Sequence, residues 1–346
     1  MPVKNSLRLR ISLMAAALIL SASTGSRLAA EAFAGQSTAR APSVSRDVRF
    51  TYTTTIALTD PAGKTLEVWI PVPHDDAWQK ISQVSVESTL AHEIVAQDDG
   101  NTVLYLHAAS PLPASTTIRL TFDAARREEA AALALAARSL PEPSDGAFAP
   151  FLKPDRLVPI DGQIAEVSTS IGATGAPALK QARALYDYVT ATMKYDKRGT
   201  GWGRGDAIYA CNVRHGNCTD FHSLFIALAR ARGIPARFTI GFPLGAPGSG
   251  PIAGYHCWAE FYAGGVWVPI DASEAWQHPK LHDYYFGHLD ADRIAFTAGR
   301  DLELKPPQHG APLNYLIYPY AEVDGAAVPR HQVKTEFSYR DLAATN

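Results

Sequence analysis

The sequence has 346 residues, of which 47% are hydrophobic and 19% are charged, and its formal net charge is −2 at pH 7. This composition is typical of a folded globular protein and excludes a disordered or collagen-like chain. Because only three cysteines are present, a small disulfide scaffold is excluded as well. No concentrated basic patch occurs, so nucleic acid is not expected as a partner. The length predicts two domains, each able to bury its own core.

The N-terminus has the features of a secretory signal peptide over residues 1–34. Its positive residues are Lys4, Arg8 and Arg10. The apolar stretch at 11–20 is about half the length that spans a bilayer, and small residues follow it. Cleavage is expected after Ser23, Ala32 or Ala34, and an uncleaved anchor is the alternative. We therefore expect a periplasmic or secreted protein with no membrane span after cleavage.

Short segments with alternating apolar residues follow the signal. The period of two over residues 48–58 predicts a half-buried strand rich in β-branched and aromatic residues. Further runs of this kind occur at 66–70, 84–86, 103–107 and 118–122, with turn-forming residues between several of them. Short strands at this spacing predict an antiparallel β-sandwich over residues 45–125.

The rest of the chain divides into three parts. A segment rich in alanine and proline predicts a connector over 126–160, and an α+β domain is expected over 161–300. Its helices are expected at 177–193 and from Asn217 or Cys218 to Arg232, and its strands at 236–241, 255–262 and 266–270. Apolar runs at 314–323 and 332–339 predict a C-terminal β extension over 301–346.

Cys218 stands at the predicted start of the second helix. The turn residues Gly216 and Asn217 lead directly into this helix. A thiol at a helix N-terminus lies at the positive end of the macrodipole, which favours the thiolate and lowers the pKa of the thiol. Cys218 is therefore a candidate nucleophile, and it needs a base.

A candidate base lies on the hairpin that follows. Residues 255–271 read YHCWAEFYAGGVWVPID, and the two glycines at 264–265 predict a two-residue hairpin loop. In that register Trp258 pairs with Asp271, so His256 is the diagonal neighbour of Asp271 on the same face. An imidazole held by a carboxylate is the base that a cysteine nucleophile requires.

The three motifs GNCTDFHSLFIALARARGIPARF, YHCWAEFY and GGVWVPID, in this order, resemble the transglutaminase-like superfamily of papain-like cysteine enzymes. The resemblance covers roughly residues 177–271 and extends more loosely to Phe296, and the layout is similar to exported bacterial members. It implies a core in which a helix carries Cys218 as nucleophile and an antiparallel sheet carries His256 and Asp271. It also implies covalent acyl transfer at an amide. No cofactor is expected.

The resemblance further implies an oxyanion hole formed by the backbone N–H of Cys218 and an upstream donor. Trp202, in the loop GTGWGRG, resembles that donor by position and chemistry. One position departs from the pattern, because the residue after the histidine is commonly Ala and here is Cys257. Strand alternation places Cys257 on the face opposite His256, where it would not touch the triad.

Two other uses of the cysteines are open. One is a zinc site, since C-x3-H-x2-C-x3-H is formed by Cys211, His215, Cys218 and His222. Its spacing matches no standard zinc module, and a glycine and an asparagine interrupt it, so no metal is expected there. The other is a disulfide between Cys211 and Cys257 in an oxidising compartment, although sequence does not give connectivity.

These features predict an exported cysteine acyl-transfer enzyme that cleaves or transfers a peptide or side-chain amide through an acyl-enzyme on Cys218. Hydrolysis is favoured over cross-linking because an amine acceptor must outcompete water. The expected partner is a peptide or protein of the cell envelope. The alternative is an envelope binding or assembly module in which the triad is silent.

Overall fold

The computed structural model describes residues 44–63, 65–137 and 146–343. The predicted signal peptide with its cleavage positions, and part of the predicted connector, lie outside the described residues. No helix in the described ranges is both long and apolar enough to cross a membrane.

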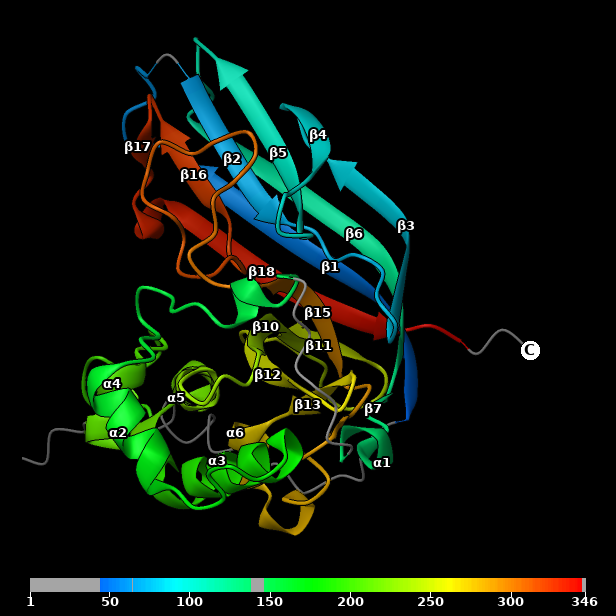
Figure 1. The fold of residues 1–346 in the computed structure, drawn as a ribbon. Helices are drawn as coiled ribbons and strands as arrows, with labels where there is room; N and C mark the ends of the chain where they lie inside the picture. Colours follow the sequence, from blue (N-terminus) through cyan, green and yellow to red (C-terminus); the bar gives the residue numbers. More distant parts are fainter. Residues whose placement is uncertain (1–43, 64, 138–145, 344–346) are drawn as a thin grey trace, which may run out of the picture. The chain divides into compact units, whose positions relative to one another are not determined.

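Two five-stranded antiparallel sheets form the sandwich, and Figure 1 shows them as stacked layers. The first sheet contains, in order, β11 (Ser249–Ile252), β18 (Val333–Asp341), β1 (Ser45–Ala57), β6 (Ser115–Arg127) and β3 (Gln79–Glu87). The second contains β17 (Ala326–Ala327), β16 (Tyr320–Val323), β2 (Thr65–Pro71), β5 (Thr102–Ala109) and β4 (Ala91–Ala96). The predicted antiparallel sandwich is confirmed, with β4 as a strand that the sequence patterns did not indicate.

The alternation that predicted β1 also explains its packing. Every second residue from Val48 to Ile56 is buried, while those between are partly exposed. The C-terminal strands complete both sheets, because β18 pairs with β1 and β16 pairs with β2. The predicted C-terminal β extension is thus built into the sandwich.

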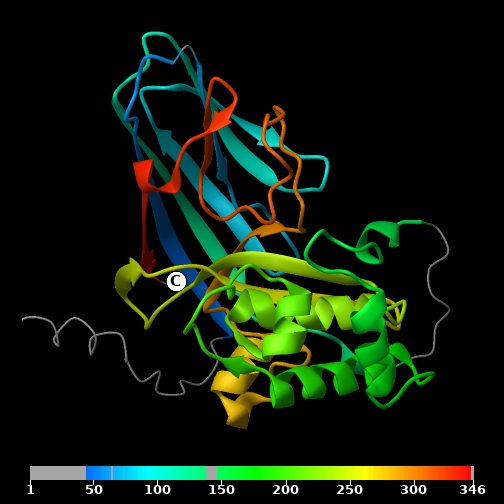
Figure 2. The same cartoon turned by 90° about the vertical axis from the view of Figure 1, so that its left-hand side faces the viewer.

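The second half of the fold is a four-stranded antiparallel sheet covered by helices. Its order is β13 (Val266–Ile270), β12 (His256–Ala263), β10 (Ala236–Pro243) and β15 (Arg293–Ala298). The helices are α2 (Gly162–Ser170), α3 (Ala178–Thr192), α4 (Ala207–Val213), α5 (Cys218–Arg230) and α6 (Ala272–Gln277). Figure 2 shows them gathered on one side of this sheet. Helix α5 packs on β10 and β12 and contacts the other four helices, so all of its residues are buried.

Shorter elements join these parts. In the connector, β7 (Glu129–Ala130) pairs with β14 (His288–Leu289), and α1 (Leu133–Ala136) and the 3-10 turn η2 (Ala149–Phe151) follow it along the chain. A parallel pair, β8 (Lys194–Tyr195) and β9 (His215–Gly216), precedes α5. Two further 3-10 turns are η3 (Pro279–Leu281) and η4 (Arg330–Gln332).

Aromatic side chains fill the junction between the sandwich and the helix-covered sheet. Phe50 of β1 lies 5.4 Å from Phe242 of β10 and 5.5 Å from Phe296 of β15, measured between ring centroids. Phe122 of β6 lies 5.7 Å from Phe296. One hydrophobic cluster continues through both parts.

Candidate active site

The first turn of α5 is fixed by a capping box. The Asn217 side chain accepts a hydrogen bond from the Thr219 backbone N–H at 3.1 Å, and the Asn217 N–H donates to the Asp220 carboxylate at 3.0 Å. This reciprocal pair explains why the helix begins at Cys218, as predicted. Within the described residues, no acceptor is found for the Cys218 N–H, which leaves this donor available to a ligand at the positive end of the helix.

Asp220 also holds the glycine-rich loop against α5. The N–H groups of Gly203 and Gly205 donate to its two carboxylate oxygens at 2.7 and 3.0 Å. Burial raises the pKa of Asp220 to about 6, against the lowering effect of its backbone hydrogen bonds. The loop is thereby held beside the start of α5.

Trp202 lies in this loop. Its indole N–H donates to the carbonyl oxygen of Gly199 at 3.2 Å. A substrate oxygen would have to compete with that carbonyl for the indole, so the oxyanion role of Trp202 stays a prediction.

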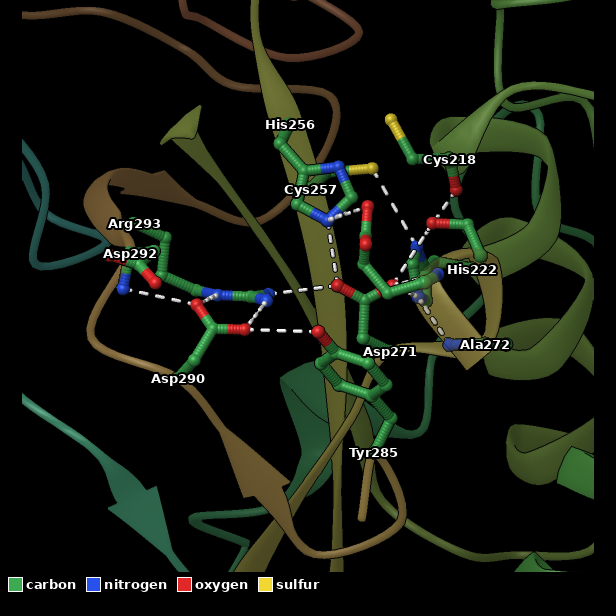
Figure 3. Close-up of polar contacts among 12 residues, drawn as sticks. Cys218, His222, His256, Cys257, Asp271, Ala272, Tyr285, Asp290, Asp292 and Arg293 are labelled. Atoms are coloured by element: carbon green, nitrogen blue, oxygen red, sulfur yellow. Dashed lines mark hydrogen bonds and ion pairs between the residues drawn. The ribbon is translucent and has the colours of Figure 1, made fainter. Parts of the chain in front are cut away.

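The hairpin has the predicted register. Its pairs run from Ala263 opposite Val266 to Ala259 opposite Ile270, which brings His256 and Asp271 together. The His256 Nε2 atom lies 2.6 Å from Asp271 Oδ2, and both residues are buried (Figure 3). This bond uses Nε2 and leaves Nδ1 for another partner.

Cys218 and His256 shift each other's pKa values in opposite directions. Burial alone would raise the pKa of the Cys218 thiol, but hydrogen bonds from Cys257 and His256 and the charge of His256 lower this pKa well below the usual range. For His256, burial alone would lower the pKa, but the charge and hydrogen bond of Asp271, together with Cys218, raise it far above the usual value. The two opposite shifts favour a thiolate–imidazolium pair.

Asp271 is fully buried and accepts several hydrogen bonds. As the N-cap of α6, its Oδ1 accepts from the Glu274 N–H at 2.9 Å and from the Ser273 hydroxyl at 3.0 Å. Its Oδ2 accepts from Arg293 at 2.8 Å as well as from His256. Burial alone would raise the pKa of Asp271, but His256 and Arg293 lower it well below the usual range. The carboxylate therefore stays ionised.

Arg293 is a site residue that sequence reasoning missed. Its guanidinium is buried and donates to Asp290 at 2.9 Å (Figure 3). It also lies 5.3 Å from the centroid of the Trp258 ring. Arg293 belongs to β15, which is not adjacent to the hairpin in the sheet order. No local pattern around residue 293 indicates this contact, because it depends on the packing of distant segments.

His222 and Cys257 also belong to the site. The Cys257 sulfur lies 3.7 Å from His222 Nδ1. Burial, and then Cys218, raise the pKa of the Cys257 thiol well above its usual value. The residue that Cys257 contacts is thus His222, which is not a member of the predicted triad. His256 is the first residue of β12 and has no partner on β13, whereas Cys257 contacts His222 of α5. The alternation of side chains predicts which face of a strand each residue takes. The site lies around the N-terminal end of β12, where residues contact neighbouring elements as well as the two faces.

The four candidate zinc ligands do not converge. Within the described residues, the set of potential ligands close enough to share an ion is Glu67, His309 and Glu322, in the sandwich. His222 Nδ1 instead contacts the Cys218 carbonyl oxygen at 2.8 Å, and Cys211 faces Gln163. All three cysteines are free thiols, so the suggested disulfide between Cys211 and Cys257 is not present.

A group of tyrosines lies beside Asn217, the N-cap of α5. The Asn217 amide donates to the Tyr255 hydroxyl at 3.0 Å, and the Tyr255 ring lies 5.9 Å from Tyr315 and 6.0 Å from Tyr318. Cys218 is only 2% exposed.

A family model described as the transglutaminase-like superfamily matches residues 165–272. The chain carries a transglutaminase-like domain. The matched segment contains Cys218, His256 and Asp271 and supports a cysteine-type enzyme in general, without specifying the reaction. Arg293 lies outside the matched segment.

Other similar proteins extend beyond the transglutaminase-like domain. An uncharacterized protein of Haemophilus influenzae is 28% identical over 333 residues, which covers 84% of this chain and 89% of the relative. A crystal structure from Cytophaga hutchinsonii, described as a "Putative Cysteine Protease", has a TM-score of 0.57 at 18% identity and covers 88% of this chain and 94% of its own. That likeness shows that the two chains share a fold.

A weaker match is the periplasmic domain of TgpA from Pseudomonas aeruginosa bound to ethylmercury. It has a TM-score of 0.35 at 14% identity and covers 70% of this chain and 93% of its own. A score this low supports no inference about the transglutaminase-like domain described here.

Proposed function

We propose that this protein is an exported cysteine enzyme that cleaves a peptide or side-chain amide through an acyl-enzyme on Cys218. The observation that carries the proposal is the 2.6 Å bond between His256 Nε2 and Asp271 Oδ2, made beside the N-terminus of α5. It leaves His256 Nδ1 for Cys218 and holds the ring in one orientation. The opposite pKa shifts of Cys218 and His256 agree with a thiolate nucleophile at rest.

The proposed reaction has two halves. The Cys218 thiolate attacks the amide carbonyl carbon, and the backbone N–H of Cys218 binds the developing oxyanion. The C–N bond then breaks, and the His256 imidazolium gives its proton to the leaving nitrogen. In the second half, neutral His256 takes a proton from water, whose oxygen attacks the thioester and releases the carboxylic acid and the thiolate.

Water is the acceptor that we favour over an amine. Hydrolysis needs only the base already present, whereas transfer to an amine needs a site that binds the amine in preference to water. The substrate class is a peptide or protein amide of the cell envelope. The export signal predicted over residues 1–34 supports this location.

Trapping of the acyl-enzyme tests the proposal. Purified protein would be mixed with an envelope extract, quenched in acid and digested, and the Cys218 peptide would be analysed by mass spectrometry. We expect an acyl adduct on Cys218 that is absent from Cys218→Ala and that disappears on incubation at neutral pH. If the protein pulls down envelope components equally well with Cys218→Ala, and no adduct forms, the silent binding module is the better explanation.

A further inference from the structure

One buried imidazole bridges the two helices that begin at the active site. His222 lies in α5, one turn after Cys218, and its side chain is fully buried. Its Nδ1 atom lies 2.8 Å from the backbone carbonyl oxygen of Cys218. Its Nε2 atom lies 3.1 Å from the backbone nitrogen of Ala272, the first residue of α6. Figure 3 shows the ring between these two backbone segments.

These contacts assign the proton of the His222 ring. A backbone N–H can only donate, so the Nε2 atom that faces Ala272 is an acceptor and carries no proton. The ring proton is therefore on Nδ1, which donates it to the Cys218 carbonyl oxygen. Burial lowers the pKa of His222, which agrees with a neutral imidazole. Both ring nitrogens are thus in use, one as a donor and the other as an acceptor.

The two bonds join the segment of the nucleophile to the segment of the carboxylate that orients the base. Ala272 directly follows Asp271, whose Oδ2 atom lies 2.6 Å from His256 Nε2. The Ala272 N–H is one of the donors at the start of α6 that have no acceptor within the helix, and His222 supplies that acceptor. A shift of the first turn of α5 relative to that of α6 would therefore break at least one of the two bonds.

We propose that His222 is a positioning residue that holds the Cys218 backbone at a fixed place relative to Asp271. The role rests on the proposed function, in which Cys218 is the nucleophile. Since Asp271 orients the His256 ring, this placement sets how the base meets the thiol. The neutral ring is the form that fills the role, because a proton on Nε2 would remove the acceptor of the Ala272 N–H.

Other titratable groups act on the His222 ring from the surrounding elements. They are Asp271 before α6, Cys218 of α5 and His256 of β12, and the Cys257 sulfur of β12 lies 3.7 Å from Nδ1. Substitution of His222 leaves each of these groups in place. A comparison of variants at this one position therefore isolates the effect of the bridge.

The test measures the thiolate of Cys218. The rate at which iodoacetamide alkylates Cys218 would be followed by peptide mapping from pH 4 to 9. We expect His222→Leu, which removes both bonds, to raise the midpoint of this profile by about one pH unit, which is about tenfold less thiolate below the midpoint. His222→Asn keeps a donor near the place of Nδ1, and His222→Gln keeps an acceptor that can reach Ala272. Each of these two variants should restore part of the difference.

Phe225→Leu is the matched control for a general loosening of α5. Phe225 is buried in the same helix and packs on Phe261 at 5.9 Å between ring centroids. Its truncation should lower the Tm, measured by thermal unfolding, and leave the midpoint of Cys218 alkylation unchanged. A shift in His222→Leu that is absent from Phe225→Leu is therefore specific to the bridge.

Two results would overturn the proposal. One is a His222→Leu profile that coincides with the parent, and the other is a Phe225→Leu profile shifted as far as that of His222→Leu. If His222→Leu does not fold, His222→Asn and His222→Gln take its place, and parent-like midpoints in both would overturn the proposal as well. The assay needs no substrate. A shifted profile without any trapped acyl-enzyme would therefore reject the proposed function while retaining the positioning role of His222.

Discussion

Arg293 and His256 bind the same oxygen of Asp271, at 2.8 and 2.6 Å. The carboxylate that orients the histidine is thus neutralised by a buried guanidinium, which also compensates Asp290. Removal of one partner from such a group leaves uncompensated charge in the interior, which is more costly than the loss of a surface ion pair.

We therefore expect Arg293→Met to lower the free energy of unfolding by about 3 to 5 kcal/mol, measured by urea denaturation. Arg183→Met is the matched control, because Arg183 pairs with Asp187 and Asp283 at the surface and should cost less than about 1 kcal/mol. Similar losses in both variants would show that Asp271 and Asp290 do not depend on Arg293.

The pH dependence of the alkylation rate of Cys218 shows whether Cys218 and His256 form a thiolate–imidazolium pair. Since the pKa of Cys218 is lowered and that of His256 is raised, alkylation should stay fast well below pH 8 and fall only when the thiolate is protonated. In His256→Ala the burial of Cys218 remains without its cation, so the rate near pH 6 should fall by at least about tenfold. The pKa of Cys211 is raised by burial, and its slow labelling should be the same in both proteins. Equal labelling of Cys218 in the two proteins would reject the pair.

Trp202→Phe tests the second oxyanion donor. If the indole N–H leaves the Gly199 carbonyl to bind the substrate oxygen, its loss should slow acylation of Cys218 by an activated ester about 100-fold or more. Alkylation by iodoacetamide forms no oxyanion and should not change. An unchanged acylation rate would show that the indole N–H of Trp202 does not bind the oxyanion, which leaves the backbone N–H of Cys218 as its donor.

Asp220→Ala removes the acceptor of three backbone N–H groups, those of Gly203, Gly205 and Asn217. We expect a loss of about 3 kcal/mol in unfolding free energy, measured by urea denaturation. Asp220→Asn keeps one acceptor oxygen and should lose less. Proteolysis within residues 199–205 should accelerate in the alanine variant, and if it does not, the loop is held by other contacts.

Glu129 predicts a pH dependence of stability. Burial, and then the charge of Glu260, raise the pKa of Glu129 to about 8, despite the charge of Arg126. The folded state therefore binds this proton more tightly than the unfolded chain. The stability that the proton contributes is complete below about pH 4, the range of an unfolded glutamate, and is lost as pH rises toward 8.

The Tm of the parent should accordingly fall between pH 5 and 8, and Glu129→Gln should remove several degrees of that fall. Glu166→Gln, at an exposed helix position, is the control and should follow the parent. A parallel decline in all three proteins would show that Glu129 is ionised throughout this range.

Local features of this site could be predicted from the sequence. Two glycines set the hairpin register that brings His256 to Asp271, and Gly216 and Asn217 mark the start of α5. The hairpin register and the helix start both depend on residues that are close together in the sequence, because local turn and cap geometry sets them.

Contacts between distant segments could not be predicted in this way. Arg293 of β15 reaches Asp271, which follows β13 at the opposite edge of the four-stranded sheet, and β18 pairs with β1 across most of the chain. The contact between Cys257 and His222 likewise depends on how β12 packs against α5.

The place of β18 has a consequence for the order of events in folding. This last strand lies between β1 and β11, and its Phe337 meets Phe242 of the helix-covered sheet at 4.3 Å between ring centroids. During synthesis or export from the N-terminus, the edge of β1 stays unpaired until β18 is available. The ring of Phe242 likewise lacks its contact with Phe337. Both halves therefore complete their packing only after the C-terminal strand is present. We expect the helix-covered part, expressed alone, to expose apolar surface and not to fold as an independent domain.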